Sequence, residues 1–187
     1  MAKLIIILAL LCVTTFGEDF DTQNSGIHSG FQPDALEWID IDRITQLTTL
    51  ISVQSGSIKS YVARGRLLGT KGTQWVPGRA FKTGSKSAFV AHLSFRYLEH
   101  QQESDFQVLV TKPEATRWIE VYAIPEHAVV GGRDPDTLEL TLVCQAIHNG
   151  TLVIGKMLSN YRNCHVASNG TEYVSSSSVK VLVANND

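Results

Sequence analysis

The chain has 187 residues, of which 43% are hydrophobic and 18% are charged, as in ordinary folded proteins. This composition excludes a disordered or collagen-like chain, and the length suffices for one sizeable core or two small ones. The 16 basic and 18 acidic residues are mixed along the sequence without a basic stripe, so we expect no nucleic-acid partner.

The N-terminal residues have the pattern of a secretory signal peptide. Lys3 precedes an apolar run from Leu4 to Val13, and Gly17 offers a small residue for cleavage before two acidic residues. A membrane anchor is the less favoured alternative, because a span needs roughly 20 apolar residues. We therefore expect residues 1–17 to be removed and the mature protein to be secreted, with no membrane span.

The rest of the chain is predicted to be all-β after a flexible N-terminal lead. Residues 18–35 form this lead, since they are rich in Gly, Ser, Asp, Asn and Gln and lack periodicity. Beyond them, apolar and polar residues alternate with period two, and no long segment has helical periodicity. Turn residues interrupt the alternation repeatedly, which indicates antiparallel strands. The clearest predicted strands cover residues 89–97, 106–110, 138–146 and 179–183.

Five short segments of the first half recur in the same order in the second half. We therefore predict a tandem duplication, with repeat one at residues 36–110, a linker at 111–115 and repeat two at 116–184. The expected fold is two tandem pseudo-symmetric antiparallel β repeats that form one compact unit. The matched segments are Trp38-Ile39-Asp40-Ile41 with Trp118-Ile119-Glu120-Val121, Tyr61-Val62-Ala63 with Leu142-Val143-Cys144, Val76-Pro77-Gly78-Arg79 with Val153-Ile154-Gly155-Lys156, Phe89-Val90-Ala91 with His165-Val166-Ala167, and Gln107-Val108-Leu109-Val110 with Lys180-Val181-Leu182-Val183.

The cysteines and two N-glycosylation sequons are consistent with a secreted protein. Cys12 lies in the predicted signal peptide, which leaves Cys144 and Cys164 as an even pair in an oxidising compartment. We expect a disulfide between them, the alternative being two buried thiols on neighbouring strands. Asn149 and Asn169 each begin an Asn-Gly-Thr sequon at a turn signal, so both are candidate N-glycosylation sites.

The second half resembles the DM-nine repeat of invertebrates. The resemblance covers the predicted fold as two repeats, and its most informative pieces are the Gly-Gly-Arg-Asp segment and the Gly-Lys that follows an apolar strand. The residues that carry it are Trp118, Ala128-Val129-Val130-Gly131-Gly132-Arg133-Asp134, Leu142-Val143-Cys144-Gln145-Ala146, His148-Asn149-Gly150-Thr151-Leu152-Val153-Ile154-Gly155-Lys156, Asn169-Gly170-Thr171-Glu172 and Val181-Leu182-Val183.

The resemblance implies a lectin that recognises mannose-type sugars in innate immunity, in which Asp134 and Lys156 hold the sugar hydroxyls. From its place on a glycine-containing turn, we expect Glu172 to supply a further acceptor or to orient Lys156. We expect no cofactor. The chemistry is reasonable because a sugar hydroxyl both donates and accepts, so a carboxylate beside an ammonium can bind two adjacent hydroxyls.

Each candidate residue also has a structural interpretation. Asp134 precedes Pro135 and Asp136, where an Asp often starts a turn through its side chain. Lys156 would then be a solvated strand residue and Glu172 its exposed partner, a pair that stabilises little.

Repeat one departs from the pattern at the site positions. Ser55-Gly56-Ser57 stands nearest to the Gly-Gly-Arg-Asp segment and has no carboxylate, Gly78-Arg79 replaces Gly-Lys, and Glu103 is not clearly equivalent to Glu172. We therefore predict at most one working site, in repeat two. Trp75 has no aromatic counterpart in repeat two, where Leu152 stands, so it is the aromatic residue with a candidate specific role.

Catalytic motifs for zinc, serine and phosphate chemistry are absent from the sequence, so we predict a non-enzyme. The six histidines are scattered, and we expect no metal site. Two function classes remain: a secreted carbohydrate-binding protein, which would gain avidity as a homo-oligomer, or a secreted protein-interaction or structural module with a decayed sugar site.

Overall fold

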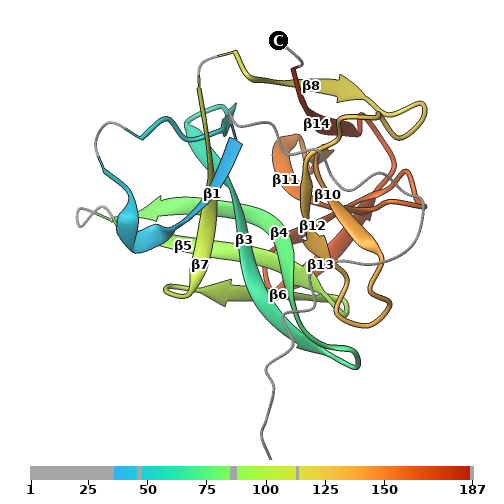
Figure 1. Cartoon of the computed structure of the whole chain (residues 1–187), viewed down its shortest axis with the longest axis horizontal. Coiled ribbons are helices and arrows are strands. Elements are labelled where there is room, and N and C mark those ends of the chain that lie inside the picture. Colours follow the sequence, from blue (N-terminus) through green and yellow to red (C-terminus); the bar gives the residue numbers. More distant parts are fainter. Residues whose placement is uncertain (1–35, 46–47, 85–87, 113, 186–187) are drawn as a thin grey trace, which may run out of the picture.

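The computed structural model describes residues 36–45, 48–84, 88–112 and 114–185. The predicted signal peptide (1–17) and N-terminal lead (18–35) lie outside the described residues. The described part is all-β, as predicted, and its strands pair antiparallel in one 14-stranded sheet (Figure 1).

The strands fall into two sets of seven that follow one another along the chain. In repeat one they are β1 (Leu36–Asp40), β2 (Ser52–Ser55), β3 (Ile58–Gly69), β4 (Gly72–Thr83), β5 (Ala88–Phe95), β6 (Leu98–Gln102) and β7 (Phe106–Thr111), with a 3-10 turn, η1 (Ile41–Arg43), after β1. In repeat two they are β8 (Thr116–Glu120), β9 (Val130–Arg133), β10 (Leu140–His148), β11 (Thr151–Leu158), β12 (Cys164–Ser168), β13 (Thr171–Ser175) and β14 (Lys180–Ala184).

The strand order shows the pseudo-symmetry. It runs β1-β7-β3-β4-β5-β6 and continues as β13-β12-β11-β10-β14-β8, so the second half repeats the first in reverse. The short strands β2 and β9 pair with β3 and β10, which are equivalent positions. The two repeats meet where β6 pairs with β13, between the blue-green and orange-red parts of Figure 1. The sheet also folds back on itself, because β4 contacts β9 and β11, and β5 contacts β12.

The hydrophobic side chains form three clusters. One lies within repeat one, around Leu93 and Phe106, and another lies within repeat two, around Cys144 and Val166. The third is shared, since it combines Trp38 of repeat one with buried residues of both repeats. The shared cluster explains why β10 is buried on both faces, although alternation predicts one apolar face.

The start of β10 differs from the prediction. The period-two pattern places a strand at residues 138–146, but β10 begins at Leu140. Leu138 has a left-handed backbone, with φ of 63°, and its side chain is 40% exposed. The tight turn that follows β9 therefore ends only after this residue, and the apolar character of Leu138 is not used in the sheet.

The strand register supports four of the five matched segments and corrects one. Arg79 pairs with His92 between β4 and β5, and Lys156 pairs with His165 between β11 and β12. His92 is therefore the counterpart of His165, and the expected match of Phe89-Val90-Ala91 with His165-Val166-Ala167 is wrong. The hairpin of β4 and β5 reaches further beyond these pairs, since 13 positions separate Arg79 from His92 and only 9 separate Lys156 from His165. The extra residues place similar short strings out of register.

Candidate functional site

Lys156 lies on β11, directly after a glycine that the fold requires. A Cβ atom on Gly155 would lie 2.0 Å from the carbonyl oxygen of His165, so only glycine lets β12 pass this closely. The Lys156 side chain points into the protein and is 4% exposed. The interpretation of Lys156 as a solvated strand residue is therefore wrong.

Asp134 directly follows β9 and uses its two carboxylate oxygens differently. Oδ1 accepts hydrogen bonds from the backbone N–H groups of Asp136 (2.9 Å) and Thr137 (3.1 Å), as a turn-forming Asp does. Oδ2 lies 3.6 Å from Lys156 Nζ. Oδ1 therefore forms the turn, as the structural interpretation predicts, while Oδ2 faces Lys156, as the site interpretation predicts.

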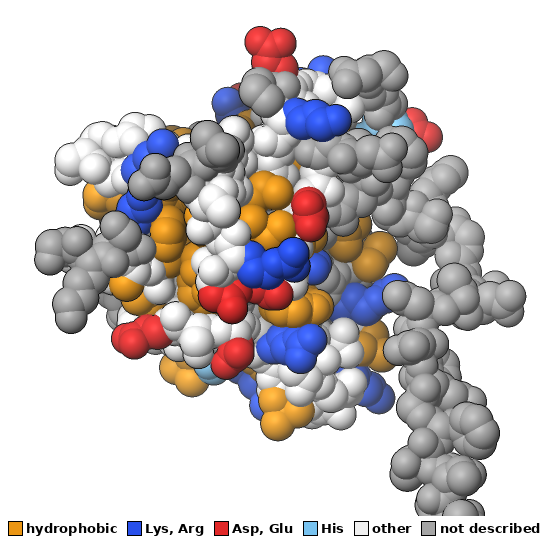
Figure 2. All heavy atoms as spheres, turned by 60° about the vertical axis from the view of Figure 1, so that its left-hand side comes forward, with side chains coloured by type: hydrophobic (Ala, Val, Ile, Leu, Met, Phe, Trp, Pro, Cys, Tyr) orange, Lys and Arg blue, Asp and Glu red, His pale blue; other side chains and the backbone are white. Residues whose placement is uncertain are grey.

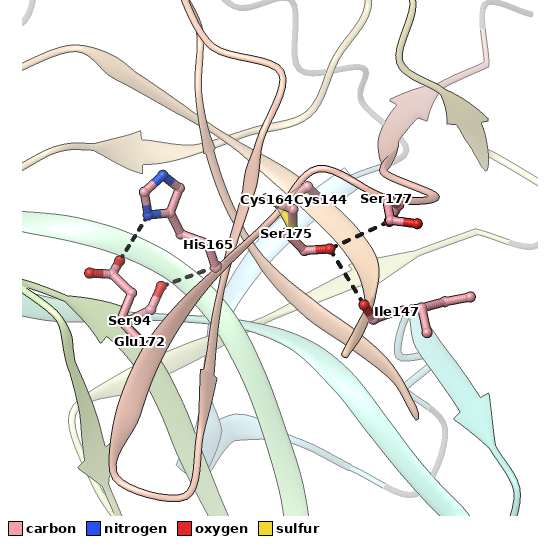
Figure 3. The surroundings of a disulfide bond; sticks show 8 residues. All are labelled: Ser94, Cys144, Ile147, Cys164, His165, Glu172, Ser175 and Ser177. Carbon is pink, nitrogen blue, oxygen red and sulfur yellow. Dashed lines mark hydrogen bonds and ion pairs between the residues drawn. A yellow bond between two sulfur atoms is a disulfide. The ribbon is translucent and has the colours of Figure 1, made fainter. Parts of the chain in front are cut away.

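Glu172 lies on β13 and is also largely buried, with a side chain that is 7% exposed. Its Oε1 lies 3.6 Å from Lys156 Nζ and 3.2 Å from Nδ1 of His165, the contact drawn in Figure 3. Its Oε2 accepts a 2.8 Å hydrogen bond from the backbone N–H of Tyr97 in repeat one. Glu172 is therefore not the exposed partner that the structural interpretation expects.

The electrostatic state of Glu172 follows from these neighbours. Burial alone raises its pKa, but the hydrogen bond with His165, the charge of Lys156 and the Tyr97 N–H together lower the pKa to about 2. Glu172 is thus a carboxylate at neutral pH.

The structure therefore brings the three predicted residues together as one cluster, hereafter the charged cluster (Asp134, Lys156 and Glu172). Both Nζ–O distances are longer than the 2.7–2.9 Å of a charge-assisted hydrogen bond. The Lys156 ammonium is therefore paired with both carboxylates as an ion pair rather than through short hydrogen bonds. Such a cluster offers donors and acceptors side by side, which is what a pair of vicinal hydroxyls requires.

Two residues of repeat one that the sequence analysis missed complete this region. Phe95 lies under the cluster, with its ring centroid 5.2 Å from Lys156 Nζ, and the next turn holds Tyr97 against Glu172. Nothing in the local sequence points to them, because they come from the other repeat. His165 had a detectable signal, since a histidine stands seven positions before a glutamate in both repeats, as His92 and Glu99 show.

Repeat one has an equivalent cluster with different chemistry. Arg79 replaces Lys156 and donates to the backbone carbonyl of Ala167 at 2.8 Å. Glu99 replaces Glu172, so the counterpart is Glu99 and not Glu103. Its Oε1 lies 2.6 Å from His92 Nδ1, and its Oε2 accepts from the N–H of Gly170 at 2.6 Å. Burial raises the pKa of Glu99, but its bonds with His92 and Gly170 outweigh burial and lower it.

The position of Asp134 is taken in repeat one by Ser55. The pairing of Gln54 with Lys59 matches that of Arg133 with Leu140, which places Ser55 at the equivalent position. Ser55 Oγ accepts a 3.0 Å hydrogen bond from the backbone N–H of Leu152 in repeat two. Repeat one therefore has no carboxylate at this position, in agreement with the sequence comparison.

Trp75 supports the backbone that leads to Asp134. The guanidinium of Arg64 lies between two indole rings, 4.5 Å from that of Trp38 and 4.8 Å from that of Trp75. A Cβ atom on Gly132 would lie 2.0 Å from the Trp75 carbonyl oxygen, so β4 lies directly against β9 here. The specific role of Trp75 in this structure is thus one of packing between the repeats.

The disulfide and the two sequons lie in repeat two. Cys144 on β10 is joined to Cys164 on β12 (Figure 3), which is the pair that the sequence analysis expects. Asn149 and Asn169 are both exposed at hairpin turns, with left-handed φ values of 50° and 52°. Both asparagine side chains are therefore accessible from solvent.

The surface carries mixed charges. On the face shown in Figure 2, basic and acidic side chains lie beside one another with hydrophobic side chains between them. Within the described ranges we find no group of three or more His, Cys, Asp or Glu side chains that could hold a metal ion. The same part of the chain contains no helix that is long and apolar enough to cross a membrane.

Comparison with known proteins bears on the fold. The family model of the DM9 (DM-nine) repeat matches residues 54–186. A search of curated proteins found no match. Among solved structures, the crystal structure of the nematode sperm cell motility protein MFP2B is similar, with 18% sequence identity and a TM-score of 0.51. The match covers 75% of this chain and 43% of that chain, so this chain spans less than half of the length of the similar structure.

Proposed function

The chain belongs to the DM9 repeat family, and on that premise we propose that it is a secreted, non-catalytic lectin that binds mannose-type glycans in innate immune recognition. The observation that carries the proposal is the charged cluster, in which Lys156 lies 3.6 Å from carboxylate oxygens of both Asp134 and Glu172. The three residues come from separate segments, yet the fold places them together.

The cluster suits a neutral polyhydroxyl ligand. A bound sugar hydroxyl accepts from the Lys156 ammonium and donates to a carboxylate, so each hydroxyl satisfies groups that are already charged. Because Asp134 Oδ1 is occupied by the turn, Oδ2 is the oxygen that we assign to the ligand. No metal ion is needed for this binding mode.

The disulfide and the sequons support the extracellular part of the proposal. A disulfide between Cys144 and Cys164 is stable in an oxidising compartment, and exposed Asn149 and Asn169 would be glycosylated there. A single sugar site of modest affinity would gain strength from several copies, so we also propose a homo-oligomer.

A glycan array with variants of the cluster tests the proposal. Asp134→Asn keeps the turn acceptor and removes the charge, and Lys156→Met removes the donor. Both variants should lose mannose-type binding by tenfold or more, with and without chelator. Arg79→Met removes the equivalent buried cation of repeat one and is the matched control, which should still bind. Melting curves would identify any variant that fails to fold.

An absence of glycan binding by the folded wild type would reject the lectin proposal. The alternative is a secreted protein-interaction or structural module with a decayed sugar site. Under this alternative, exposed apolar side chains such as Leu68 (72% exposed) and Tyr122 (77% exposed) would contact the partner. The same fold also occurs in a protein that is named for cell motility. Capture of one defined protein partner that Tyr122→Ser abolishes would support this alternative.

A further inference from the structure

The turn between β5 and β6 has a conformation that its sequence does not favour. Arg96 and Tyr97 both have left-handed backbones, with φ of 52° and 65°. The equivalent turn of repeat two has Asn169 and Gly170, the residue types that such hairpin turns prefer. An aromatic residue in this region is uncommon and strained, and strain of this kind is often kept at functional sites.

This turn is fixed against the charged cluster by contacts at two points. The backbone of Tyr97 pairs with Glu172, donating to its carboxylate at 2.8 Å and accepting from its N–H at 3.1 Å. Arg96 forms two hydrogen bonds to Asp136, at 2.6 and 2.9 Å, and the N–H of Asp136 bonds to Asp134. The turn of repeat one is thus tied to both carboxylates of the cluster in repeat two.

The side chain of Tyr97 extends from this turn into solvent. Tyr97 is 80% exposed, whereas the preceding Phe95 is 4% exposed and packs under Lys156. The strained turn therefore joins an exposed phenol side chain, through its backbone, to the hydrogen-bonding groups of the cluster. This combination matches a pyranose ring, which has hydroxyls at its edge and C–H groups on its face.

Resting on the proposed function, we infer that Tyr97 of repeat one forms the aromatic wall of the sugar site in repeat two. The sugar ring stacks its C–H face on the phenol ring while two neighbouring hydroxyls reach Asp134 and Lys156. The site is then composite, and repeat one contributes to it although its own cluster lacks a counterpart of Asp134. Tyr97 selects pyranoses with an open C–H face next to a pair of vicinal hydroxyls.

The Tyr97→Gly variant removes the phenol ring and leaves the backbone of the turn in place. Glycine adopts the left-handed conformation without strain and keeps the backbone bonds to Glu172, so the variant should fold at least as well as the wild type. We expect it to bind mannose-type glycans about tenfold more weakly, whereas Tyr97→Phe should bind like the wild type. Tyr122→Gly removes an equally exposed tyrosine outside this turn and is the matched control.

Proton NMR of methyl α-mannoside gives a second measurement. Stacking should shift the C–H resonances of the sugar upfield with the wild type and Tyr97→Phe, and should not do so with Tyr97→Gly. If Tyr97→Gly binds as tightly as the wild type while Asp134→Asn does not bind, the aromatic wall is rejected and the lectin proposal stands. If the folded wild type binds no glycan, both are rejected.

Discussion

The buried cations of the two repeats occupy equivalent positions but have different neighbours. Lys156 in repeat two lies between two carboxylates at 3.6 Å, whereas Arg79 in repeat one donates to a backbone carbonyl at 2.8 Å. Burial lowers the pKa of Arg79, and the charge of Glu99 opposes this effect. The cation of repeat one thus serves the packing between the repeats, while that of repeat two is buried near two carboxylates, where we propose that it meets a ligand.

The features common to both repeats have a structural reason. In each repeat a Glu on β6 or β13 pairs with a His on the neighbouring strand and accepts from the N–H of a turn in the other repeat. We call these two contacts, Glu172 with Tyr97 and Glu99 with Gly170, the crossed clamps. The crossed clamps are thus common to both repeats, whereas the positions of Asp134 and Lys156 differ between the repeats and distinguish the candidate site.

The largest effect is expected from the two glycines that precede the buried cations. A Cβ on Gly155 would lie 2.0 Å from the His165 carbonyl oxygen, and one on Gly78 would lie 2.4 Å from the His92 carbonyl oxygen. Gly155→Ala and Gly78→Ala should each lower the free energy of unfolding by about 4 kcal/mol in urea titrations. Gly150→Ala meets no atom within 4 Å and should lose only about 1 kcal/mol, through its left-handed φ. A Gly155→Ala protein as stable as the Gly150→Ala control would contradict the shared strand packing.

Removing the disulfide makes the core of repeat two resemble that of repeat one. The strand register places Ala63 and Ala91 at the positions of Cys144 and Cys164, and both alanines are fully buried. Cys144→Ala with Cys164→Ala should fold but lose about 3 kcal/mol of unfolding free energy, as expected for a loop of 20 residues. Urea titration of the double variant measures this loss. An unchanged urea midpoint would mean that the disulfide does not stabilise repeat two.

The smallest effect is expected from acid and applies to the glutamates of both clamps. The pKa of Glu172 is lowered to about 2 in the folded protein, below its ordinary value of 4.5. Its carboxylate therefore stabilises the fold above about pH 4.5, and this stability is lost as the pH falls toward 2. At pH 3 the loss is about 2 kcal/mol.

Stability measured between pH 7 and pH 3 tests this sign. Glu172→Gln should have a flatter profile than the wild type, and Glu99→Gln should also be flatter, because the pKa of Glu99 is lowered as well. The exposed Glu103→Gln is the control and should follow the wild type. Stability that increases in acid for the wild type would show that these carboxylates are not held in their charged form.

Much of the fold could be predicted from the sequence because strand alternation and repeated strings are local signals. They indicated an all-β duplication, and they identified Lys156, Asp134 and Glu172 before their proximity was known. The correspondence between β5 and β12 could not be predicted in this way. It depends on how far the preceding hairpin extends in each repeat, so Glu99 and His92 were not recognised as counterparts of Glu172 and His165.

The contacts between the repeats also could not be predicted from the sequence. Phe95 and Tyr97 lie more than 50 positions from Lys156 in the chain, and only the meeting of β6 with β13 places them beside the cluster. The two uses of Asp134 could not be separated either, because one carboxylate group serves both the turn and the cation. The sequence therefore identifies candidate residues but not the surface that they share.

The crossed clamps also bear on how such a chain can change over generations. Each buried glutamate accepts a hydrogen bond from an N–H group of the other repeat. Loss or exchange of one repeat would therefore leave a buried carboxylate of the remaining repeat without this donor. Neither half satisfies its buried glutamate alone, so each half of the duplication depends on the other.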